Sequence, residues 1–559
     1  MDERRPGLAS LSPLLPLLLP LAVLAVYLPG VSADFVFDDQ VLVLKNGLTD
    51  SLRRAPEMFR VGLWESVPGL PGDGKEYYRP LMLLSLAVDR ALGGFSPVVA
   101  HLQNLGWHLA AVGLLFRLLE STLGDRRAAL AGAALFAVHP AQVEAVQWIS
   151  ARNDPMAAVF LLLSLSLLSD AERPAWRTAA GGLAALAALL CKESALASPL
   201  LLALICQARG RGWGDRAAYL SLLAATAVYA ALRASAGAIS PAIPLEKLPG
   251  AIGMISAFYA ERLLWTPGLP PLIKLAWAPP TPWWALAVLA ALVGLALWRG
   301  GRLALLGLAL AALTWAPSLG GLLVTAEPAS RYLYLPLVGL GLTLGASLRG
   351  RASAGPVALA LLVTLTATSA RLLPRWRDDQ TLWTSTLAMW PSPYAHGAYA
   401  KFLEERGELD QAAEHYRLAT APPRPYDHSC FNITAIHLKR GDPSSAVRDG
   451  QAALAAGCAP SPELLGPLSI ALAATGDWEA AERAAAQVGP DPTGKAVLVR
   501  VAAAARRGDF APFDAVAGGA REALAQQVGW LLRQGGAPDA AEATAAHAAG
   551  EATAAPERR

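Results

Sequence analysis

Long apolar runs follow one another from Leu11 to Leu373, and they restrict the fold more than any other feature of the sequence. Of the 559 residues, 54% are hydrophobic and 16% are charged, whereas soluble domains carry about 25% charged residues. Backbone polar groups in lipid must be satisfied within the chain, so runs of this length predict membrane-spanning helices. We therefore expect residues 1–373 to form an all-α, polytopic transmembrane body.

The N-terminus has two interpretations. Arg4 and Arg5 precede the apolar run from Leu11 to Leu28, and Val31-Ser32-Ala33 resembles a signal-peptidase site, which is consistent with a cleaved signal peptide. We favour an uncleaved first span, because about 20 apolar residues suffice to cross a bilayer. The two arginines would then hold its N-terminus in the cytoplasm.

Positive charge recurs at alternate ends of the apolar runs. The clusters that follow the expected second, fourth, sixth, eighth and tenth spans are Arg117, Arg126 and Arg127; Arg173 and Arg177; Arg209, Arg211 and Arg216; Arg299 and Arg302; and Arg349 and Arg351. They fall on one side if the segment from Ile252 to Trp277, which contains Glu261, Arg262 and Lys274, is an interfacial helix. The positive-inside rule then predicts about eleven spans and an exported C-terminal part.

Ionisable residues of both signs collect in the loops expected on the outer side. These loops hold Asp38, Asp39 and Arg79; His139, Glu144, Arg152 and Asp154; Lys192 and Glu193; and Glu327, Arg331 and Tyr332. Charges at the ends of spans are costly and usually functional. Cations there suit a lipid phosphate, and carboxylates suit proton transfer. The alternative is that Lys192–Glu193 and Glu144–Arg152 are ion pairs that lock helices together.

The acidic pair Asp38 and Asp39 comes directly after the first apolar run. Adjacent carboxylates raise each other's pKa, which would help one of them act as a base near neutral pH. A solvated acidic loop is the structural alternative. We expect Asp39 to be the base, with Asp38 as second choice. A divalent metal that bridges the two carboxylates to a phosphate is an open alternative.

The remainder of the chain contains a repeat. Gly407, Gly441 and Gly476 are 34 and 35 residues apart, and an alanine follows five residues after each glycine. This period is typical of tetratricopeptide repeats, in which small residues allow paired helices to pack closely. We expect a linker at 374–390, a repeat α-solenoid at 391–536 and an Ala-rich tail at 537–559. Such a solenoid binds an extended peptide on its concave face, or it serves only self-association.

Neither the cysteines nor the net charge indicates a metal or a nucleic acid. The four cysteines have no metal-ligand spacing, and the net charge is only +3. Cys191 and Cys206 lie in apolar runs and are expected to be buried thiols. Cys430 and Cys458 could pair in an oxidising compartment if their geometry allows it.

Six segments carry a resemblance to a known family. They are FVFDDQ, YRPLMLLSLAVDRALGG, HLQNLGWH, AVHPAQVEAVQWISARNDPMAAVFLLLSL, LLCKES and RYLYLP, and the repeats follow them. In this order they resemble the transmembrane O-mannosyltransferases that target cadherins and their bacterial relatives. More broadly, the chain is similar to the GT-C superfamily of lipid-linked glycosyltransferases, up to about Pro492.

The resemblance implies an outward-facing active site and a polyprenyl-phosphate sugar donor, with mannose or another hexose. The sugar would pass with inversion to hydroxyl groups of an exported polypeptide. By position, Asp38 and Asp39 are the catalytic candidates, and Arg79, Lys192, Arg331 and Tyr332 the donor-phosphate ligands. The other active-site candidates are His101, Asn104, His108, His139, Glu144, Arg152, Asp154 and Glu193. Gln142 stands where relatives often carry a second histidine, so no role of that histidine is transferred.

The composition, rich in Ala, Gly and Arg, indicates a high-GC bacterium, so we expect an inner-membrane protein with periplasmic repeats. Three alternatives stay open. A transporter would be expected to show internal symmetry and ionisable groups at the midplane, whereas these groups collect at one face. A non-catalytic membrane-anchored repeat scaffold would need no charges at the outer span ends. A GT-C transferase that modifies glycans or lipids would share the whole transmembrane body.

Overall fold

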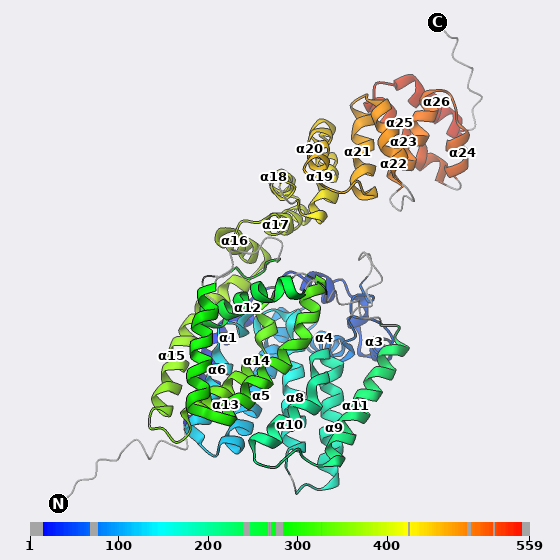
Figure 1. Ribbon diagram of the computed structural model, residues 1–559. Helices are drawn as coiled ribbons and strands as arrows, with labels where there is room; N and C mark the ends of the chain where they lie inside the picture. The colour runs from blue at the N-terminus through cyan, green and yellow to red at the C-terminus, as the bar shows by residue number, and fades with distance from the viewer. Residues whose placement is uncertain are drawn as a thin grey trace, which may run out of the picture. The chain divides into compact units, whose positions relative to one another are not determined.

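The computed structural model describes residues 15–67, 77–170, 172–238, 246, 248–265, 268, 270–274, 283–325, 327–422, 425–488, 494–517 and 520–549. Within these ranges the chain forms helices and no strands, which confirms the all-α class. The chain divides into two compact units, Met1–Ser385 and Thr386–Arg559 (Figure 1). Arg4, Arg5, the start of the predicted first span and the end of the predicted tail lie outside the described residues.

The first unit is a bundle of helices of very different lengths. Its α-helices are α1 (Leu18–Tyr27), α2 (Asp39–Leu42), α3 (Ala55–Met58), α4 (Pro80–Gly93), α5 (Pro97–Leu123), α6 (Arg126–Val138), α7 (Gln142–Gln147), α8 (Asn153–Leu168), α9 (Ala175–Cys191), α10 (Ser198–Ala208), α11 (Arg216–Ser235), α12 (Leu248–Trp265), α13 (Trp283–Thr325), α14 (Pro336–Leu348), α15 (Ala354–Leu372) and α16 (Asp379–Met389). Short 3-10 helices connect several of them, among them η3 (Leu28–Ser32), η6 (Ile149–Ala151), η7 (Glu193–Ala197), η11 (Ser330–Leu333) and η12 (Leu373–Trp376).

Five segments are long and apolar enough to cross a membrane. They are Pro97–Leu123, Ile149–Leu168, Arg216–Ser235, Trp283–Leu319 and Ala354–Trp376. Shorter apolar helices, such as Ala175–Cys191 and Pro336–Leu348, pack among them. Together they agree with a multi-pass membrane body, whereas the count of about eleven spans stays a prediction.

The segment α13 consists of two helices that meet at Gly301. A single helix of 43 residues would extend over about 65 Å, twice the ~30 Å of a bilayer's hydrocarbon core. Gly301 has φ 53° and ψ −134°, a conformation that L-residues rarely adopt, and it breaks the helix there. The break lies between Arg299 and Arg302, where the sequence predicts a loop between two spans.

Glycines bring α6, α13 and α14 into close backbone contact. A Cβ on Gly132 of α6 would lie 2.3 Å from the carbonyl oxygen of Gly341 in α14. A Cβ on Gly339 would lie 2.4 Å from the carbonyl oxygen of Gly307 in α13. Small residues at such crossings allow apolar helices to associate in lipid, where hydrophobic burial between helices contributes little. This packing fixes α6, and with it the loop that begins at His139.

That loop forms the interior of the first unit. Every residue from 136 to 159, including the polar ones, is buried. Buried polar groups are costly unless they are paired, and the partners come from several elements, as described below. In Figure 1 α12 lies near the upper end of the first unit. It is not among the segments that qualify as spans, although its interfacial position stays a prediction, because part of 266–280 lies outside the described residues.

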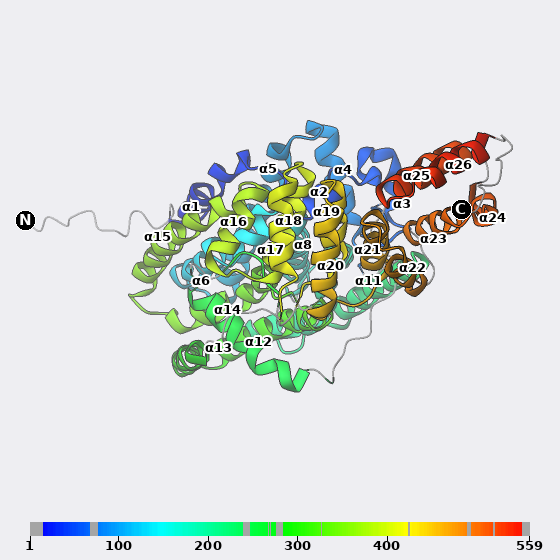
Figure 2. The same ribbon diagram turned by 90° about the horizontal axis from the view of Figure 1, so that it is seen from above.

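The second unit consists of short helices that pack in consecutive pairs. They are α17 (Pro393–Glu405), α18 (Leu409–Ala419), α19 (Asp427–Lys439), α20 (Pro443–Ala455), α21 (Pro462–Ala474), α22 (Trp478–Gln487), α23 (Lys495–Arg506), α24 (Ala511–Ala517), α25 (Arg521–Gln534) and α26 (Pro538–Ala549). Gly407, Gly441 and Gly476 have φ values of 78°, 73° and 90° and end the first helix of each of the first three pairs. Figure 2 shows α25 and α26, the last pair, side by side.

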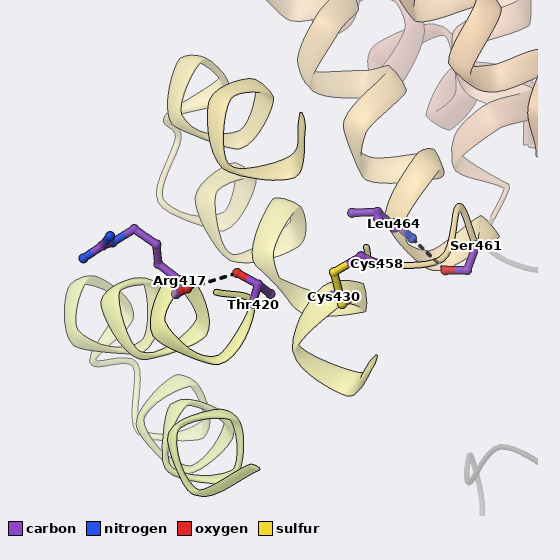
Figure 3. The surroundings of a disulfide bond; sticks show 6 residues. All are labelled: Arg417, Thr420, Cys430, Cys458, Ser461 and Leu464. Carbon is purple, nitrogen blue, oxygen red and sulfur yellow. Dashed lines mark hydrogen bonds between the residues drawn. A yellow bond between two sulfur atoms is a disulfide. The ribbon is translucent and has the colours of Figure 1, made fainter. Parts of the chain in front are cut away.

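A disulfide joins two parts of the second unit. Cys430 in α19 is bonded to Cys458, which follows α20, and their Cα atoms lie 5.8 Å apart (Figure 3). The pairing that the sequence left open is therefore present in the structure. Cys191 and Cys206 are free and buried, as predicted.

Candidate active site

The two adjacent carboxylates of the first loop have different surroundings. Asp39 begins α2 and is fully buried. It accepts hydrogen bonds from the backbone N–H of Ser150 (2.8 Å), from the Ser150 hydroxyl and from the backbone N–H of Val36 (3.1 Å). Asp38 is half-buried, and no group among the described residues donates a hydrogen bond to its carboxylate. Asp39 therefore holds the loop against η6, whereas the Asp38 carboxylate is left open.

Both carboxyl groups have raised pKa values. Burial raises the pKa of Asp38 to about 8; Glu327, Asp39 and Asp379 add to the rise, and Arg331 opposes it. Burial also raises the pKa of Asp39 to about 7, against the hydrogen bonds from Ser150 and Val36. A carboxyl group in this range exchanges its proton near neutral pH, as a general base must.

Arg331 and Tyr332 lie on η11, directly before α14. The Arg331 guanidinium forms an ion pair with Glu144 of α7 and lies 4.8 Å from the Trp148 ring centroid. Glu144 also accepts a hydrogen bond from the backbone N–H of Ser330 (2.8 Å). Burial opposes the charge of Arg331, but Glu144 outweighs it, and the pKa of the guanidinium is raised. Arg331 therefore stays a cation at every physiological pH.

Lys192 lies at the end of α9, close to the Tyr332 ring. Its ammonium group pairs with Asp154 and lies 5.4 Å from the Tyr332 ring centroid. Arg331 lies 5.1 Å from that centroid, so both cations lie close to one aromatic ring. Tyr332, Lys192 and Arg331 also interact electrostatically with Arg79 or with each other. The structure thus brings together residues that are more than a hundred positions apart.

Arg79 contributes a third cation to this cluster. It precedes α4, lies 3.2 Å from the Glu193 carboxylate and lies 4.6 Å from the ring centroid of Tyr77. Glu193 is shared with Arg233 of α11 at 3.7 Å. We call Arg79, Lys192, Arg331 and Tyr332 the cation cluster. Its cations are largely buried, with side chains 15%, 9% and 17% exposed in that order.

The ion pairs considered from the sequence are wrong in their partners. Glu144 pairs with Arg331 rather than Arg152, and Lys192 pairs with Asp154 rather than Glu193. Lys192 has extended backbone between α9 and η7, so the side chains of Lys192 and Glu193 point to different neighbours.

Arg152 lies in the interior instead of the cation cluster. Its side chain is fully buried and pairs with Asp89 of α4 at 2.5 Å. It also donates to the side chain of Gln103 (2.5 Å) and to the carbonyl oxygen of Ala100 (3.0 Å) in α5. These contacts join α4, α5 and α8, and they indicate a structural ion pair.

His108 is also embedded in the helix packing. Its two ring nitrogens bond the hydroxyl of Tyr334 (2.7 Å) and the carbonyl oxygen of Ala137 (2.9 Å). The rings of Tyr27 and Phe136 pack around it. Its bonding capacity is used within the bundle, so the structure does not bring it to the cation cluster.

Asn104 and His101 lie one and two turns earlier on α5. Asn104 donates to the carbonyl oxygens of Val146 (3.1 Å) and Trp148 (3.3 Å) and so holds the buried loop. His101 is buried beside the backbone of Ala33 and Asp34, close to the start of the acidic loop. Both residues therefore contact the backbone of loops that carry site residues.

His139 is held as one neutral tautomer. Its Nε2 donates to the carbonyl oxygen of Leu263 in α12 (3.1 Å), and its Nδ1 accepts from the backbone N–H of Ala141 (3.1 Å). Burial lowers the pKa of His139 to about 4. Gln142, at the position of the missing second histidine, is buried and donates to the carbonyl oxygen of Phe136 (3.2 Å). His139 therefore links the buried loop to α12.

No role was assigned to Asp379 from the sequence, which placed Glu327 in an outer loop without marking it as a site residue. Asp379 of α16 bonds the acidic loop, and Glu327, which pairs with Lys274 at 3.0 Å, acts on the Asp38 carboxyl. One signal could have found Asp379: Asp378-Asp379-Gln380 after the last apolar run repeats the Asp-Asp-Gln of 38–40.

A small cavity lies behind the Arg331–Glu144 ion pair. This cavity of ≈ 20 Å³ lies beside Glu144, Arg262 and Ser330, which is room for about one water molecule. Arg262 donates to the Ser330 hydroxyl at 2.9 Å and so supports η11 from behind. Within the described ranges, no group of three or more His, Cys, Asp or Glu side chains is placed to hold a metal ion.

Part of the chain is similar in sequence to proteins named protein O-mannosyl-transferases. The chain is 36% identical over 177 residues to the protein O-mannosyl-transferase Tmtc1 of Drosophila melanogaster, which is 31% of this chain and 20% of the fly protein. It is 38% identical over 144 residues to the protein O-mannosyl-transferase TMTC2 of Mus musculus, 25% of this chain and 17% of the mouse protein. The chain thus spans about a fifth of the length of these relatives. No family model and no solved structure matches.

Proposed function

We propose that this protein is an integral-membrane glycosyltransferase that moves a sugar, mannose or another hexose, from a polyprenyl-phosphate donor to hydroxyl groups of exported polypeptides. The observation that carries the proposal is the pairing of a half-buried, proton-exchanging carboxyl, Asp38, with the cation cluster around Tyr332. The names of the similar proteins support a protein acceptor and a sugar transfer.

The cation cluster suits the leaving phosphate. When the bond between the anomeric carbon and the phosphate oxygen breaks, negative charge develops on the phosphate, and fixed cations stabilise it most at that moment. Glu144, Asp154 and Glu193 hold the cations in place before the donor arrives. Each cation already has a carboxylate partner. We therefore expect the donor phosphate to bind cations that remain paired with these carboxylates, rather than to displace water from free cations.

Asp38 is the proposed base. The acceptor hydroxyl loses its proton to the Asp38 carboxylate while its oxygen attacks the anomeric carbon from the side opposite the phosphate, and this inverts the configuration. Asp39 is less suited, because its oxygens already accept three hydrogen bonds. We therefore propose Asp38, the second choice from the sequence, as the base in place of Asp39.

The proposed location is a bacterial inner membrane, with about eleven spans and the acidic loop and second unit on the periplasmic side. The Cys430–Cys458 disulfide supports an exported second unit, since disulfides persist in oxidising compartments. The composition supports the bacterial source, whereas the similar proteins named above come from animals.

The second unit is proposed to receive the acceptor chain as a tetratricopeptide solenoid. Helix pairs joined at glycines with positive φ, at a spacing of 34 and 35 residues, support this assignment. A solenoid of this kind offers an extended surface that suits an unfolded polypeptide better than a single sugar or lipid.

The test is mass spectrometry of envelope proteins from cells with the gene, without it, and with restored variants. Hexose on serine or threonine should disappear on deletion and return with the native chain but not with Asp38→Asn. Arg331→Ala should weaken binding of polyprenyl-phosphate mannose in proteoliposomes. If Asp38→Asn restores glycosylation fully, the protein is a scaffold; if only glycans or lipids change, the acceptor class is wrong.

A further inference from the structure

The residue before the proposed base has an unusual backbone. Phe37 is the one non-glycine residue with positive φ (52°) among those that the structure describes. For a bulky aromatic residue this left-handed conformation is a true outlier, and it persists only when surrounding contacts impose it. Such outliers cluster at active sites and ligand-binding loops.

One carboxylate bonds to both ends of the Phe37–Gln40 turn. The backbone N–H of Phe37 donates to Oδ1 of Asp379 at 2.7 Å, and Nε2 of Gln40 reaches Oδ2 of the same residue at 3.3 Å. Asp379 is only 8% exposed, which strengthens these bonds relative to bonds in water. The two contacts lie on either side of Asp38 in the chain, so Asp379 clamps the loop from which the Asp38 carboxylate projects.

The same helix also holds the Phe37 side chain. Its ring centroid lies 5.7 Å from that of Trp383 in α16 and 5.5 Å from that of Trp148 in the buried loop. Trp148 is the residue on which the Arg331 guanidinium lies. The left-handed residue is thus fixed at its N–H and at its ring, and the ring connects it to the cation cluster.

We propose that Asp379 is a positioning residue for sugar transfer: it holds the Phe37–Gln40 turn so that the Asp38 carboxylate faces the cation cluster. The inference rests on the proposed function of that site. Nothing in the apolar pattern of the chain or in the resemblance assigned a role to Asp379, which lies in the stretch that the sequence predicted as a linker.

Asp379 acts on the base through its charge as well as its geometry. The groups that face Asp38 are Asp39, Glu327, Asp379 and Arg331; the three carboxylates raise its pKa, and Arg331 lowers it. Removing the charge of Asp379 should therefore lower the pKa of Asp38, whereas removing the clamp should misplace the carboxylate. The two effects have different kinetic signatures.

The experiment uses full-length protein in proteoliposomes, with polyprenyl-phosphate mannose and a synthetic serine/threonine peptide as probes. Asp379→Ala removes the clamp and should reduce kcat about 100-fold, the loss expected from a misplacement of about 1 Å. The KM for the donor should stay within about twofold, because the cation cluster is unchanged. Asp379→Asn keeps an oxygen that accepts from the Phe37 N–H, so this variant should recover most of kcat. Because it lacks the charge of Asp379, the rise of its activity with pH should occur at lower pH than in the native protein.

Asp378→Asn is the matched control. Asp378 carries the same charge one residue away, but it accepts from the backbone N–H of Thr381 (2.7 Å) at the start of α16, and asparagine can do the same. We expect native kcat and an unshifted pH profile. Thermal unfolding of all variants separates misfolding from misplacement.

Two results would overturn the inference while the native protein transfers the sugar. They are native kcat in Asp379→Ala, and equal losses in Asp379→Asn and Asp379→Ala without a pH shift. If the native protein itself transfers nothing to the peptide under any condition, the proposed function has failed instead. The two failures are therefore distinguishable.

Discussion

At the scale of single residues, the pair Asp38 and Asp39 illustrates how a fold separates the roles of neighbours. Asp39 turns inward, where Ser150 and Val36 donate to it. Asp38 interacts electrostatically with Arg331 and Glu327, and no group among the described residues donates a hydrogen bond to it. The same residue type thus serves the loop in one position and is left available for chemistry in the next.

Substitution of the two carboxylates should separate these roles. Asp38→Asn should abolish transfer and leave the thermal unfolding temperature unchanged, because no hydrogen bond is lost. Asp39→Asn should lower stability by about 1–3 kcal/mol, since its NH₂ group cannot accept the hydrogen bonds made to the second oxygen. Transfer assays and unfolding curves measured on both variants check this; equal unfolding temperatures would contradict it.

The pH dependence of transfer should report Asp38. Because the base must be deprotonated and its pKa is about 8, kcat/KM should rise with pH and level off above about 8. Glu327→Gln removes a charge that raises this pKa, so its profile should shift to lower pH. Arg331→Lys keeps the charge and serves as the control. A profile that is flat between pH 6 and 9 at roughly constant stability would exclude Asp38 as the base.

At the scale of elements, close helix crossings hold the buried loop in place. α6 ends at Val138, directly before His139, and its position depends on the contact between Gly132 and α14. α14 in turn begins directly after the Arg331-Tyr332 segment. A change at this crossing therefore reaches both the loop with Glu144 and the cation cluster.

Adding a methyl group at the crossing should be destabilising. A Cβ on Gly341 would lie 2.7 Å from the carbonyl oxygen of Gly132, so Gly341→Ala forces the helices apart. We expect a loss of about 1–3 kcal/mol, seen as a lower unfolding temperature in detergent. Gly106→Ala is the matched control, because no other atom lies within 4 Å of its added Cβ, and it should be neutral or stabilising. Equal behaviour of the two variants would exclude close packing as the reason for Gly341.

At the scale of the whole molecule, the chain joins an apolar helical unit to a polar helical unit with a disulfide. The two units require different solvents, because the first exposes apolar helices such as α13 and the second exposes charged side chains. The transfer reaction is proposed for the first unit and acceptor binding for the second.

The disulfide should report the compartment of the second unit. Cys430 and Cys458 enclose a loop set by a sequence separation of 28, so Cys458→Ser should cost about 3–4 kcal/mol in the chain-entropy model. In intact cells the native pair should resist thiol alkylation until a reductant is added. The free thiols Cys191 and Cys206 are buried and should stay unlabelled in folded protein. Immediate labelling of Cys430 without reductant would contradict an oxidising location.

Truncation should divide the two activities. A chain that ends after Trp390 keeps Asp38, Asp379 and the cation cluster, so it should bind polyprenyl-phosphate mannose and hydrolyse it slowly. Transfer to a full-length protein acceptor should fall strongly, because the second unit is missing. The measurements are kcat/KM for a protein acceptor and the rate of donor hydrolysis, each determined for the truncated and the full-length chain. An unchanged kcat/KM would make the second unit an assembly device.

The sequence by itself determined the properties that depend on local pattern. Apolar runs specify a helical membrane body, because every backbone group in lipid must bond within its own helix. A glycine at every repeat allows positive φ, and this is why helix pairs could be predicted around Gly407 and Gly441. The charged loops were also identified, since charges are rare among apolar runs.

Only the tertiary structure decided the partners. Glu144 bonds Arg331 from 187 positions away, and Asp379 bonds Phe37 from 342 positions away. Sequence spacing is uninformative over such distances, because packing of whole helices sets which loop ends meet. For the same reason Arg152 and His108, both active-site candidates from the sequence, lie in the helix interior, where they bond to neighbouring helices.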